Sequence, residues 1–311
     1  MKTPSNIIEL PGRNTVDSTA FQLLVIILLG AELALGFAVF RGWYWLAVPL
    51  VLVVSHFMHG VLIGFHEASH GLLRRNRAFN EFDGVLAGIF SFTSFSLYRA
   101  AHQTHHAFLS TERDEELWPF VDTTKPLWAR RLAAFLELNL GLLFTPFLFL
   151  RTFFRSNSPI RNRKVRRRIW AEIIAIVLVW TSVLWAVSHW HVWSYFLWMY
   201  VAPGMLAANM QSWRKYIEHV GLTGSTVNGC TRNIVSHTWL GRFLAYTLLH
   251  EPYHGVHHFH PGIPHDALPN FLPELDPTRA DEQPLYSSYW SAVKHLIRSL
   301  ADPRVGAQWR P

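Results

Sequence analysis

Two long apolar stretches near the start of the chain constrain its fold more than any other feature. Residues 21–40 are interrupted only by Gln22 and Glu32, and residues 43–65 contain no Lys, Arg, Asp or Glu. About 20 such residues in a helix cross the roughly 30 Å hydrocarbon core of a bilayer. Because only two residues separate the stretches, we predict a tight hairpin of two transmembrane helices.

Two further apolar stretches, residues 169–190 and 192–213, are oriented by the basic residues around them. Six of the eight residues 161–168 are basic, and Arg214 and Lys215 follow the second stretch, whereas the turn between the two has no Lys or Arg. Positive charge concentrates on the cytoplasmic side of membrane helices. We therefore predict a second hairpin with both ends in the cytoplasm.

A fifth apolar stretch, residues 132–154, has a different pattern. Basic residues flank both ends, and polar residues and a proline interrupt it. These are Arg130, Arg131, Arg151 and Arg155 at the ends, with Glu137, Asn139 and Pro146 inside. Positive charge at both ends favours an interfacial or re-entrant helix, and the alternative is a fifth span.

The remaining segments, residues 66–131 and 214–311, are polar. Near the end of the chain, apolar residues recur at the spacing of an amphipathic helix: Tyr286, Tyr289, Trp290, Val293, Leu296, Ile297 and Leu300. We therefore predict an all-α integral membrane protein with a single domain over residues 1–311. It would have about four transmembrane helices in two hairpins, an interfacial or re-entrant helix, and a cytoplasmic helical cap. Both termini are expected in the cytoplasm.

The composition indicates a metal protein. The chain has 311 residues and 18 histidines, although only 16% of its residues are charged. Its one cysteine, Cys230, excludes a disulfide framework, a four-cysteine zinc site and a cysteine-ligated iron–sulfur cluster within this sequence. The net charge of +7 fits a membrane surface or an acidic protein as partner. We predict no nucleic-acid partner.

Eight histidines form three clusters. The first follows the second apolar stretch, the second lies in the loop region after it, and the third follows the second hairpin. The clusters are His66 and His70; His102, His105 and His106; and His254, His257 and His258. Residues at i, i+3 and i+4 project from one face of a helix, and the two hairpins place all three clusters on one side of the membrane. Eight imidazoles exceed the about four ligands of a zinc site and suit two metals of higher coordination number.

Other interpretations of these residues have less support. Residues 66–70 match the H-E-x-x-H pattern of zinc metalloproteases, but six more clustered histidines do not fit its single third ligand. A metal transporter would need ligands within the spans, where the candidates Glu32, His56, His59 and Glu172 are few and scattered. Histidines beside membrane helices can also make only polar contacts, but three clusters at this spacing argue against that role.

The order and spacing of the clusters resemble the integral-membrane fatty acid desaturase and hydroxylase superfamily, the three-histidine-box di-iron enzymes. Residues 214–219, Arg-Lys-Tyr-Ile-Glu-His, are similar to the Arg-x-x-x-Glu-His segment of that family. Residues 257–265 resemble its His-His-x-x-Pro-x-x-Pro ending, and Leu268 and Pro269 follow in the usual place. The resemblance covers roughly residues 64–269.

The resemblance implies a non-haem centre of two iron ions with O₂ as co-substrate. Its ligands would be the eight clustered histidines together with His219. At the position where some members also use an asparagine, through water, this chain has Lys215. We expect His250, Glu218 and Glu67 to support the ligands, with direct metal binding by His250 as an alternative. No ligand role is expected for the core or tunnel residue His59, for His189 and His191 across the membrane, or for the loop residues His260 and His265.

The resemblance also implies the reaction. Such a centre reduces O₂ to an oxidant that abstracts hydrogen from an unactivated C–H bond, and the usual substrate is an acyl chain. We predict a membrane-bound O₂-dependent oxidoreductase and, first, a fatty acyl or lipid desaturase. A membrane hydroxylase of carotenoid or fatty acyl substrates and a fatty acid oxidative decarboxylase are the alternatives. Residues 66–71 followed by 75–77 resemble the carotenoid hydroxylase branch.

The electrons for O₂ reduction require a partner. The sequence has no cytochrome b5-like haem segment, no cysteine cluster, and no G-x-G-x-x-G between a strand and a helix. We therefore predict a separate ferredoxin-, rubredoxin- or cytochrome b5-like carrier with its reductase. Arg74, Arg75, Arg77 and the basic residues 161–168 are candidate docking residues, with anchoring to anionic lipid as the alternative.

Overall fold

The computed structural model describes residues 11–310, which form helices and loops without a β-sheet. Among these residues, one isolated backbone bridge joins Ile234 and Tyr286. The predicted position of the N-terminus lies outside the described residues. The architecture agrees with the predicted all-α membrane class, because three helices are long and apolar enough to span a bilayer. They are α1 (Thr19–Phe40), α2 (Tyr44–His70) and α7 (Arg163–His189).

The first hairpin joins α1 and α2 through a tight turn. Gly42 has a φ of 68°, a left-handed conformation that favours glycine and lets the chain reverse within two residues. Leu35 and Ala38 of α1 pack with Val51 of α2 in one buried cluster. The opposite face of α1 exposes its large apolar side chains, so this face suits contact with lipid: Ile26, Leu33, Phe37 and Phe40.

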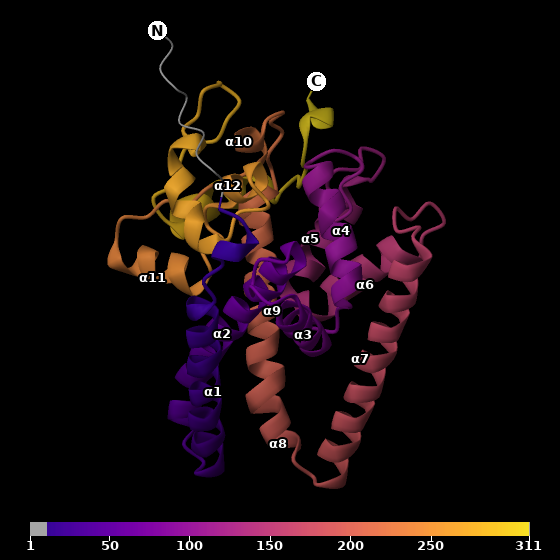
Figure 1. Ribbon diagram of the computed structural model, residues 1–311, viewed down its shortest axis with the longest axis vertical. Helices are drawn as coiled ribbons and strands as arrows, with labels where there is room; N and C mark the ends of the chain where they lie inside the picture. The colour runs from indigo at the N-terminus through magenta and orange to yellow at the C-terminus, as the bar shows by residue number, and fades with distance from the viewer. Residues whose placement is uncertain (1–10, 311) are drawn as a thin grey trace.

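The fourth predicted span is helical but not uniform. It consists of α8 (Trp193–Phe196), a π-helical turn (Leu197–Val201) and α9 (Ala202–His219). From their shared lower end, α7 and α9 diverge like the arms of a V (Figure 1). The helix α9 packs on α2, whereas α7 packs on α3 (Arg77–Phe90) and α4 (Phe95–Ala107). The indole of Trp180 in α7 donates to the carbonyl of Ile89 in α3 at 2.8 Å, which ties α7 to α3.

The segment expected to be interfacial or re-entrant forms two helices. These are α5 (Leu127–Asn139) and α6 (Gly141–Phe154), which meet at Leu140. With 13 and 14 residues, each is shorter than the about 20 residues of a straight span. A side chain at Gly141 would place its Cβ 2.7 Å from the carbonyl oxygen of Ala208, so glycine permits the close approach of α6 to α9.

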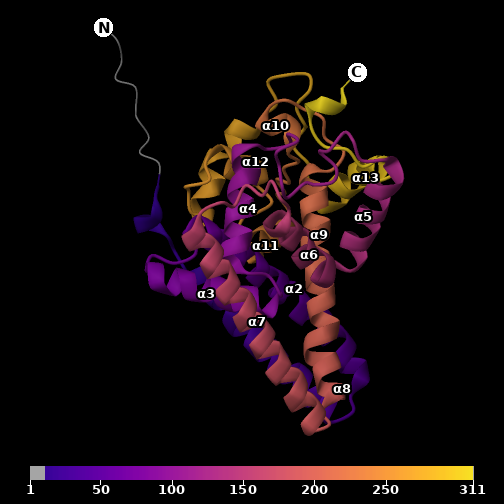
Figure 2. The same cartoon turned by 90° about the vertical axis from the view of Figure 1, so that its right-hand side faces the viewer.

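Short helices and loops form a cap above the long helices (Figure 1). The turns at Gly42 and after α7 lie at the opposite end of the molecule. The helix predicted near the end of the chain is present as α13 (Tyr289–Ser299), which buries Ala292 and Leu296. The predicted apolar face is correct only in part, because Tyr286 precedes the helix and Trp290 and Ile297 are exposed. Figure 2 shows α13 and α3 on opposite sides of the molecule, with α3 lower than α13. The remaining elements are α10 (Val227–Cys230), α11 (Trp239–Thr247), α12 (His254–Phe259), α13 (Tyr289–Ser299), and 3₁₀ segments at Arg13–Thr15, His265–Leu275 and Ala307–Trp309.

Candidate metal centre

The first histidine cluster lies on the last two turns of α2. The helix ends directly after His70 because Gly71 takes a left-handed conformation with a φ of 77°, a common helix stop. Asn80 of α3 then fixes the end of α2. Its side-chain nitrogen donates to the carbonyl of Ala68 at 2.9 Å, and its oxygen accepts from the amide of Leu73 at 3.1 Å.

The second cluster lies on α4, whereas the sequence interpretation placed it in a loop region. The hydroxyl of Ser94 caps this helix by accepting from the amide of Leu97 at 3.2 Å. The carboxylate of Glu172 in α7 accepts from the hydroxyl of Ser94 at 2.6 Å and the amide of Ser96 at 2.8 Å. A negative charge at a helix N-terminus is favourable. A contact from a distant part of the chain therefore starts the helix that carries His102, His105 and His106.

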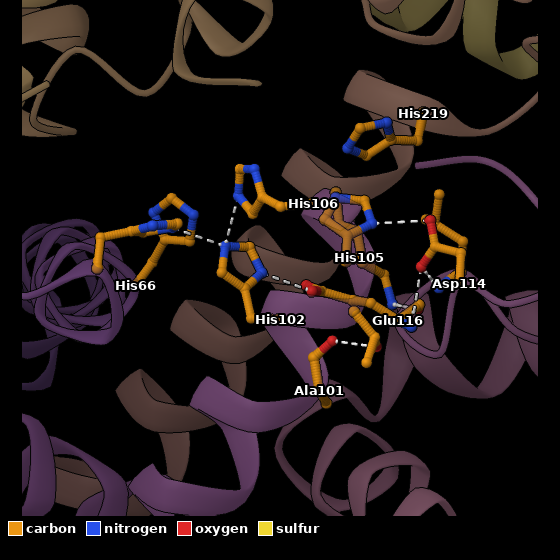
Figure 3. Close-up of polar contacts among 12 residues, drawn as sticks. His66, Ala101, His102, His105, His106, Asp114, Glu116 and His219 are labelled. Carbon is orange, nitrogen blue, oxygen red and sulfur yellow. Dashed lines mark hydrogen bonds and ion pairs between the residues drawn. The ribbon is translucent and has the colours of Figure 1, made fainter. Parts of the chain in front are cut away.

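The third cluster lies on the short helix α12, and His219 is the last residue of α9. The nine predicted ligands come together in two groups, within which the ligand atoms lie within 4.8 Å of one another. The first group contains His66, His70, His102, His106 and His257, and the second contains His105, His219, His254 and His258. Figure 3 shows members of the two groups side by side, with His105 and His219 apart from His66, His102 and His106. The second and third sequence clusters are thus each divided between the groups.

The Nε2 atoms point inward in both groups. In the first, Nε2 of His102 lies 3.0 Å from Nε2 of His70 and of His106. In the second, Nε2 of His254 lies 2.8 Å from that of His219 and 3.0 Å from that of His258. Two metal–nitrogen bonds of about 2.1 Å at a right angle would separate their nitrogens by about 3.0 Å. This spacing fits two nitrogens that share a metal ion.

Acceptors outside the groups hold the other ring nitrogen of four histidines. Nδ1 of His102 lies 2.7 Å from Glu116, and Nδ1 of His105 lies 2.8 Å from Asp114 (Figure 3). Nδ1 of His219 lies 3.0 Å from the carbonyl oxygen of Cys230, and Nδ1 of His254 lies 3.0 Å from Glu251. When Nδ1–H donates to such an acceptor, Nε2 keeps its lone pair for a metal.

Burial and neighbouring imidazoles also favour the neutral, metal-binding form of most of these rings. The exception is His105, where burial is outweighed by Asp114 and Glu116, which raise the pKa of this ring. Burial, followed by the neighbouring imidazoles, holds the pKa of His102, His257 and His258 well below its usual range. Neither ring nitrogen of His66, which is 1% exposed, has a hydrogen-bond partner among the described residues. Neutral imidazoles bind iron, copper, zinc and nickel. The nine histidines therefore fit a pair of transition-metal ions.

Three carboxylates around the groups were missed by sequence reasoning. Asp114 and Glu116 belong to the acidic run at residues 112–116, which stands out after the second cluster in a chain with few charges. The sequence therefore contained a signal for these two carboxylates. Glu251 precedes the third cluster by three residues, and its importance depends on tertiary contacts that no spacing rule contains. It is paired with the buried guanidinium of Arg214, which also contacts Glu218 at 2.6 Å.

Of the three residues expected to support the ligands, Glu67 and Glu218 lie near predicted ligands, whereas His250 does not belong to either group. Glu67 lies 3.5 Å from Nδ1 of His66, and Glu218 lies 3.6 Å from Nε2 of His254. His250 lies outside both groups, and its ring stacks between Tyr253 and His265. Lys215 also lies outside both groups. Its ammonium pairs with the buried carboxylate of Glu137.

The histidines given no ligand role also lie outside the two groups. His59 is buried within α2, and His265 is buried at the start of a 3₁₀ segment rather than exposed in a loop. His260 pairs with Glu274 at 2.7 Å. His189 and His191 lie at the turn after α7, at the far end of the molecule from the cap.

A pocket lies beside the first group. The ring of Tyr98, which lines it, stacks on His102 with 5.2 Å between centroids and an angle of 10°. Apolar side chains from α2 and α6, including Phe65 and Phe149, line the same pocket together with Glu116. The pocket therefore lies between the long helices and Glu116, which contacts the predicted metal ligand His102.

The comparison with known proteins agrees with the geometry. Residues 43–290 match the family model described as fatty acid desaturase. The matched range contains both histidine groups and α2 through α12. No curated protein matches the chain. Because the family model covers most of the sequence, the resemblance predicted from the histidine boxes is confirmed: the chain belongs to the fatty acid desaturase family.

Proposed function

We propose that the chain is a membrane-bound, O₂-dependent desaturase of a lipid acyl chain with two iron ions at the histidine groups. The observation that carries this proposal is the division of nine buried or partly buried imidazoles into one group of five and one of four. Two irons bound there would supply O₂ activation and removal of hydrogen from C–H bonds. Membership in the fatty acid desaturase family supports a lipid oxidoreductase of this type.

The protein residues have binding and positioning roles. The imidazoles would hold the metals through Nε2, and Asp114, Glu116 and Glu251 would hold three of the rings in one tautomer and orientation. The pocket next to the first group has a volume of about 70 Å³, and its apolar side chains such as Phe65 and Phe149 would contact a short segment of an acyl chain, although Glu137, Arg214 and Lys215 also line it. Its buried position would exclude bulk water from the reacting carbon atoms.

The topology of the long helices supports a cytoplasmic site. The basic residues 161–168 lie at the end of α7 that is nearer the cap, and the turn after α7 has no Lys or Arg. By the charge bias of membrane proteins, the cap, the histidine groups and the termini would face the cytoplasm. A separate electron carrier and its reductase would then reach the site from that side.

Lipid and metal analysis together test the proposal. We expect the purified protein to contain two irons per chain, and cells that express it to accumulate lipids with a new carbon–carbon double bond. The His258→Ala variant is the inactive control. New hydroxyl groups instead of double bonds would replace the desaturase with a hydroxylase, and one zinc with little iron would overturn the di-iron proposal.

A further inference from the structure

A second, cationic pocket opens next to His70. It lies where the end of α2 meets α3, α4 and the 3₁₀ segment Arg13–Thr15, and it has a volume of about 200 Å³. Unlike the pocket beside Tyr98, it has no large apolar side chain in its lining. The lining residues are Arg13, Ser69, His70, Gly71, Arg77, Asn80, Glu81 and Arg99.

Positive charge exceeds negative charge in this pocket. Three arginines face one carboxylate, and Glu81 is already shared between Arg99 and Arg168, each at 2.5 Å. Arg77 is exposed and forms no ion pair with any residue between 11 and 310. The pocket therefore attracts a negatively charged partner.

Some of the other candidate docking residues of the sequence analysis are held in intramolecular contacts, whereas Arg161, Arg163, Lys164 and Arg167 are exposed and form no ion pair with any residue between 11 and 310. Arg74 pairs with Asp83 at 2.6 Å, and Nε of Arg75 donates to the carbonyl of Val16 at 2.8 Å. In the 161–168 segment, Arg166 donates to the carbonyl of Ile160 at 3.1 Å. Within the group Arg74, Arg75 and Arg77, Arg74 alone forms an ion pair among the described residues, and Arg77 is the member that lines the pocket beside His70.

The pocket reaches a predicted metal ligand directly. His70 lines it and is only partly buried, whereas His66 and His102 of the same group are buried. On its inner side, Nε2 of His70 lies 3.0 Å from Nε2 of His102. A protein docked over the pocket would contact His70, and only this imidazole ring would lie between it and the first predicted metal position. Because the rate of electron transfer falls steeply with distance, a carrier docked beside His70 would be well placed to reduce the metals.

We propose that this pocket is the docking site of a small acidic electron-carrier protein, and that its electrons enter the centre past His70. This inference rests on the proposed function. Each reduced carrier would lose one electron to the metal centre that the two histidine groups would hold. Two such electrons and two protons, with two hydrogens from the acyl chain, convert one O₂ into two waters and leave one double bond.

Stopped-flow reduction of the iron-loaded, full-length protein tests the proposal. The probe is reduced plant-type ferredoxin, mixed without O₂ or lipid substrate, and the readout is the rate of ferredoxin oxidation. We expect Arg77→Glu to lower the second-order rate by about tenfold at low salt, because electrostatic steering is lost. The wild-type rate should fall as salt rises, since charges are screened over about 10 Å at 0.1 M.

Matched variants distinguish a loss of carrier docking from a loss of folding or of iron. Arg298→Glu reverses another exposed arginine, on α13 at the opposite side of the molecule, and should keep the wild-type rate (Figure 2). Arg77→Lys keeps the charge and should retain most of the rate. Arg77 begins α3, where a glutamate is favourable to the helix, so Arg77→Glu should fold and keep its iron.

Three results would overturn the proposal. A wild-type rate for Arg77→Glu and Arg13→Glu at low salt would place docking elsewhere. If these variants lose binding to anionic vesicles but oxidise ferredoxin at an unchanged rate, the pocket is a site for lipid headgroups. Failure of dithionite to reduce even the wild-type centre would instead refute the proposed di-iron function, and the docking proposal with it.

Discussion

Glu251 accepts a hydrogen bond from Nδ1 of His254 at 3.0 Å, and the same carboxylate reaches the other histidine group. Its second oxygen lies 3.4 Å from Nδ1 of His66. His254 and His66 belong to different groups, so one buried side chain contacts a predicted ligand of each metal. The buried guanidinium of Arg214 pairs with the carboxylate oxygen that accepts from His254.

We expect Glu251→Gln to weaken binding at both metal positions. Loss of a carboxylate that orients a metal-binding histidine typically lowers affinity by about 10–100-fold. Iron per chain, measured after dialysis against a chelator, should fall well below that of the wild type. The control is Glu274→Gln, which changes another histidine partner, that of His260, outside both groups. Equal iron retention in the two variants would show that Glu251 does not support the centre.

Adjacent histidines should have separate effects on metal content. His257 belongs to the first group and His258 to the second, although they are neighbours in sequence. We expect His257→Ala to weaken the first metal position and His258→Ala the second. Mössbauer spectra of iron-57 protein, compared at limiting iron, should lose different components in the two variants. Identical spectral changes would contradict the division of the histidine boxes.

Local sequence patterns predicted the parts of the molecule that depend on short-range spacing. The apolar stretches correspond to α1, α2 and α7, and the apolar spacing near the end corresponds to α13. The histidine spacing indicated the family, because one helical turn brings such residues onto one face. The direct assignment of each histidine to a metal stays a prediction.

Long-range contacts account for what the sequence did not reveal. The helix α4 starts on a carboxylate, Glu172, that is 76 positions away from the amide of Ser96. The break at Leu140 precedes Gly141, which packs closely on α9, and this contact requires the folded chain. The pairing of Glu251 with both histidine groups likewise requires the folded chain. The π-helical turn at Leu197–Val201 has a local sequence signal instead, because Pro203 has no amide hydrogen to donate to the carbonyl of Met199.

The buried ion pair of Lys215 and Glu137 should be strongly coupled. Both side chains are nearly inaccessible, and the hydroxyl of Tyr216 also donates to Glu137 at 3.0 Å. Removing one charge leaves the other buried and unpaired, which typically costs about 3–5 kcal/mol. We expect Lys215→Met to lower the thermal midpoint in detergent strongly, and added Glu137→Gln to recover much of the loss.

Lys294→Met is the control for this cycle, because Lys294 is an exposed lysine on α13. It should leave the midpoint unchanged. Additive losses in the double variant would mean that Lys215 and Glu137 stabilise the protein independently rather than as a pair.

His265 should make the stability of the cap depend on pH. Burial, together with nearby His250, lowers the pKa of His265 from 6.5 to about 4. Between these values the unfolded chain binds a proton that the folded chain excludes, so stability rises with pH. The contribution is complete above pH 6.5 and is lost as the pH falls towards 4, by about 3 kcal/mol at most.

We therefore expect the thermal midpoint of His265→Gln to fall less steeply than that of the wild type between pH 6.5 and 4. His237→Gln replaces an exposed histidine and should follow the wild-type curve. Because the metal ligands also titrate on acidification, the comparison is made on iron-free protein, and only the difference between variants is interpreted. Parallel curves for wild type and His265→Gln would show that His265 gains its proton equally in the folded and unfolded states, and hence that its burial has no linkage to folding.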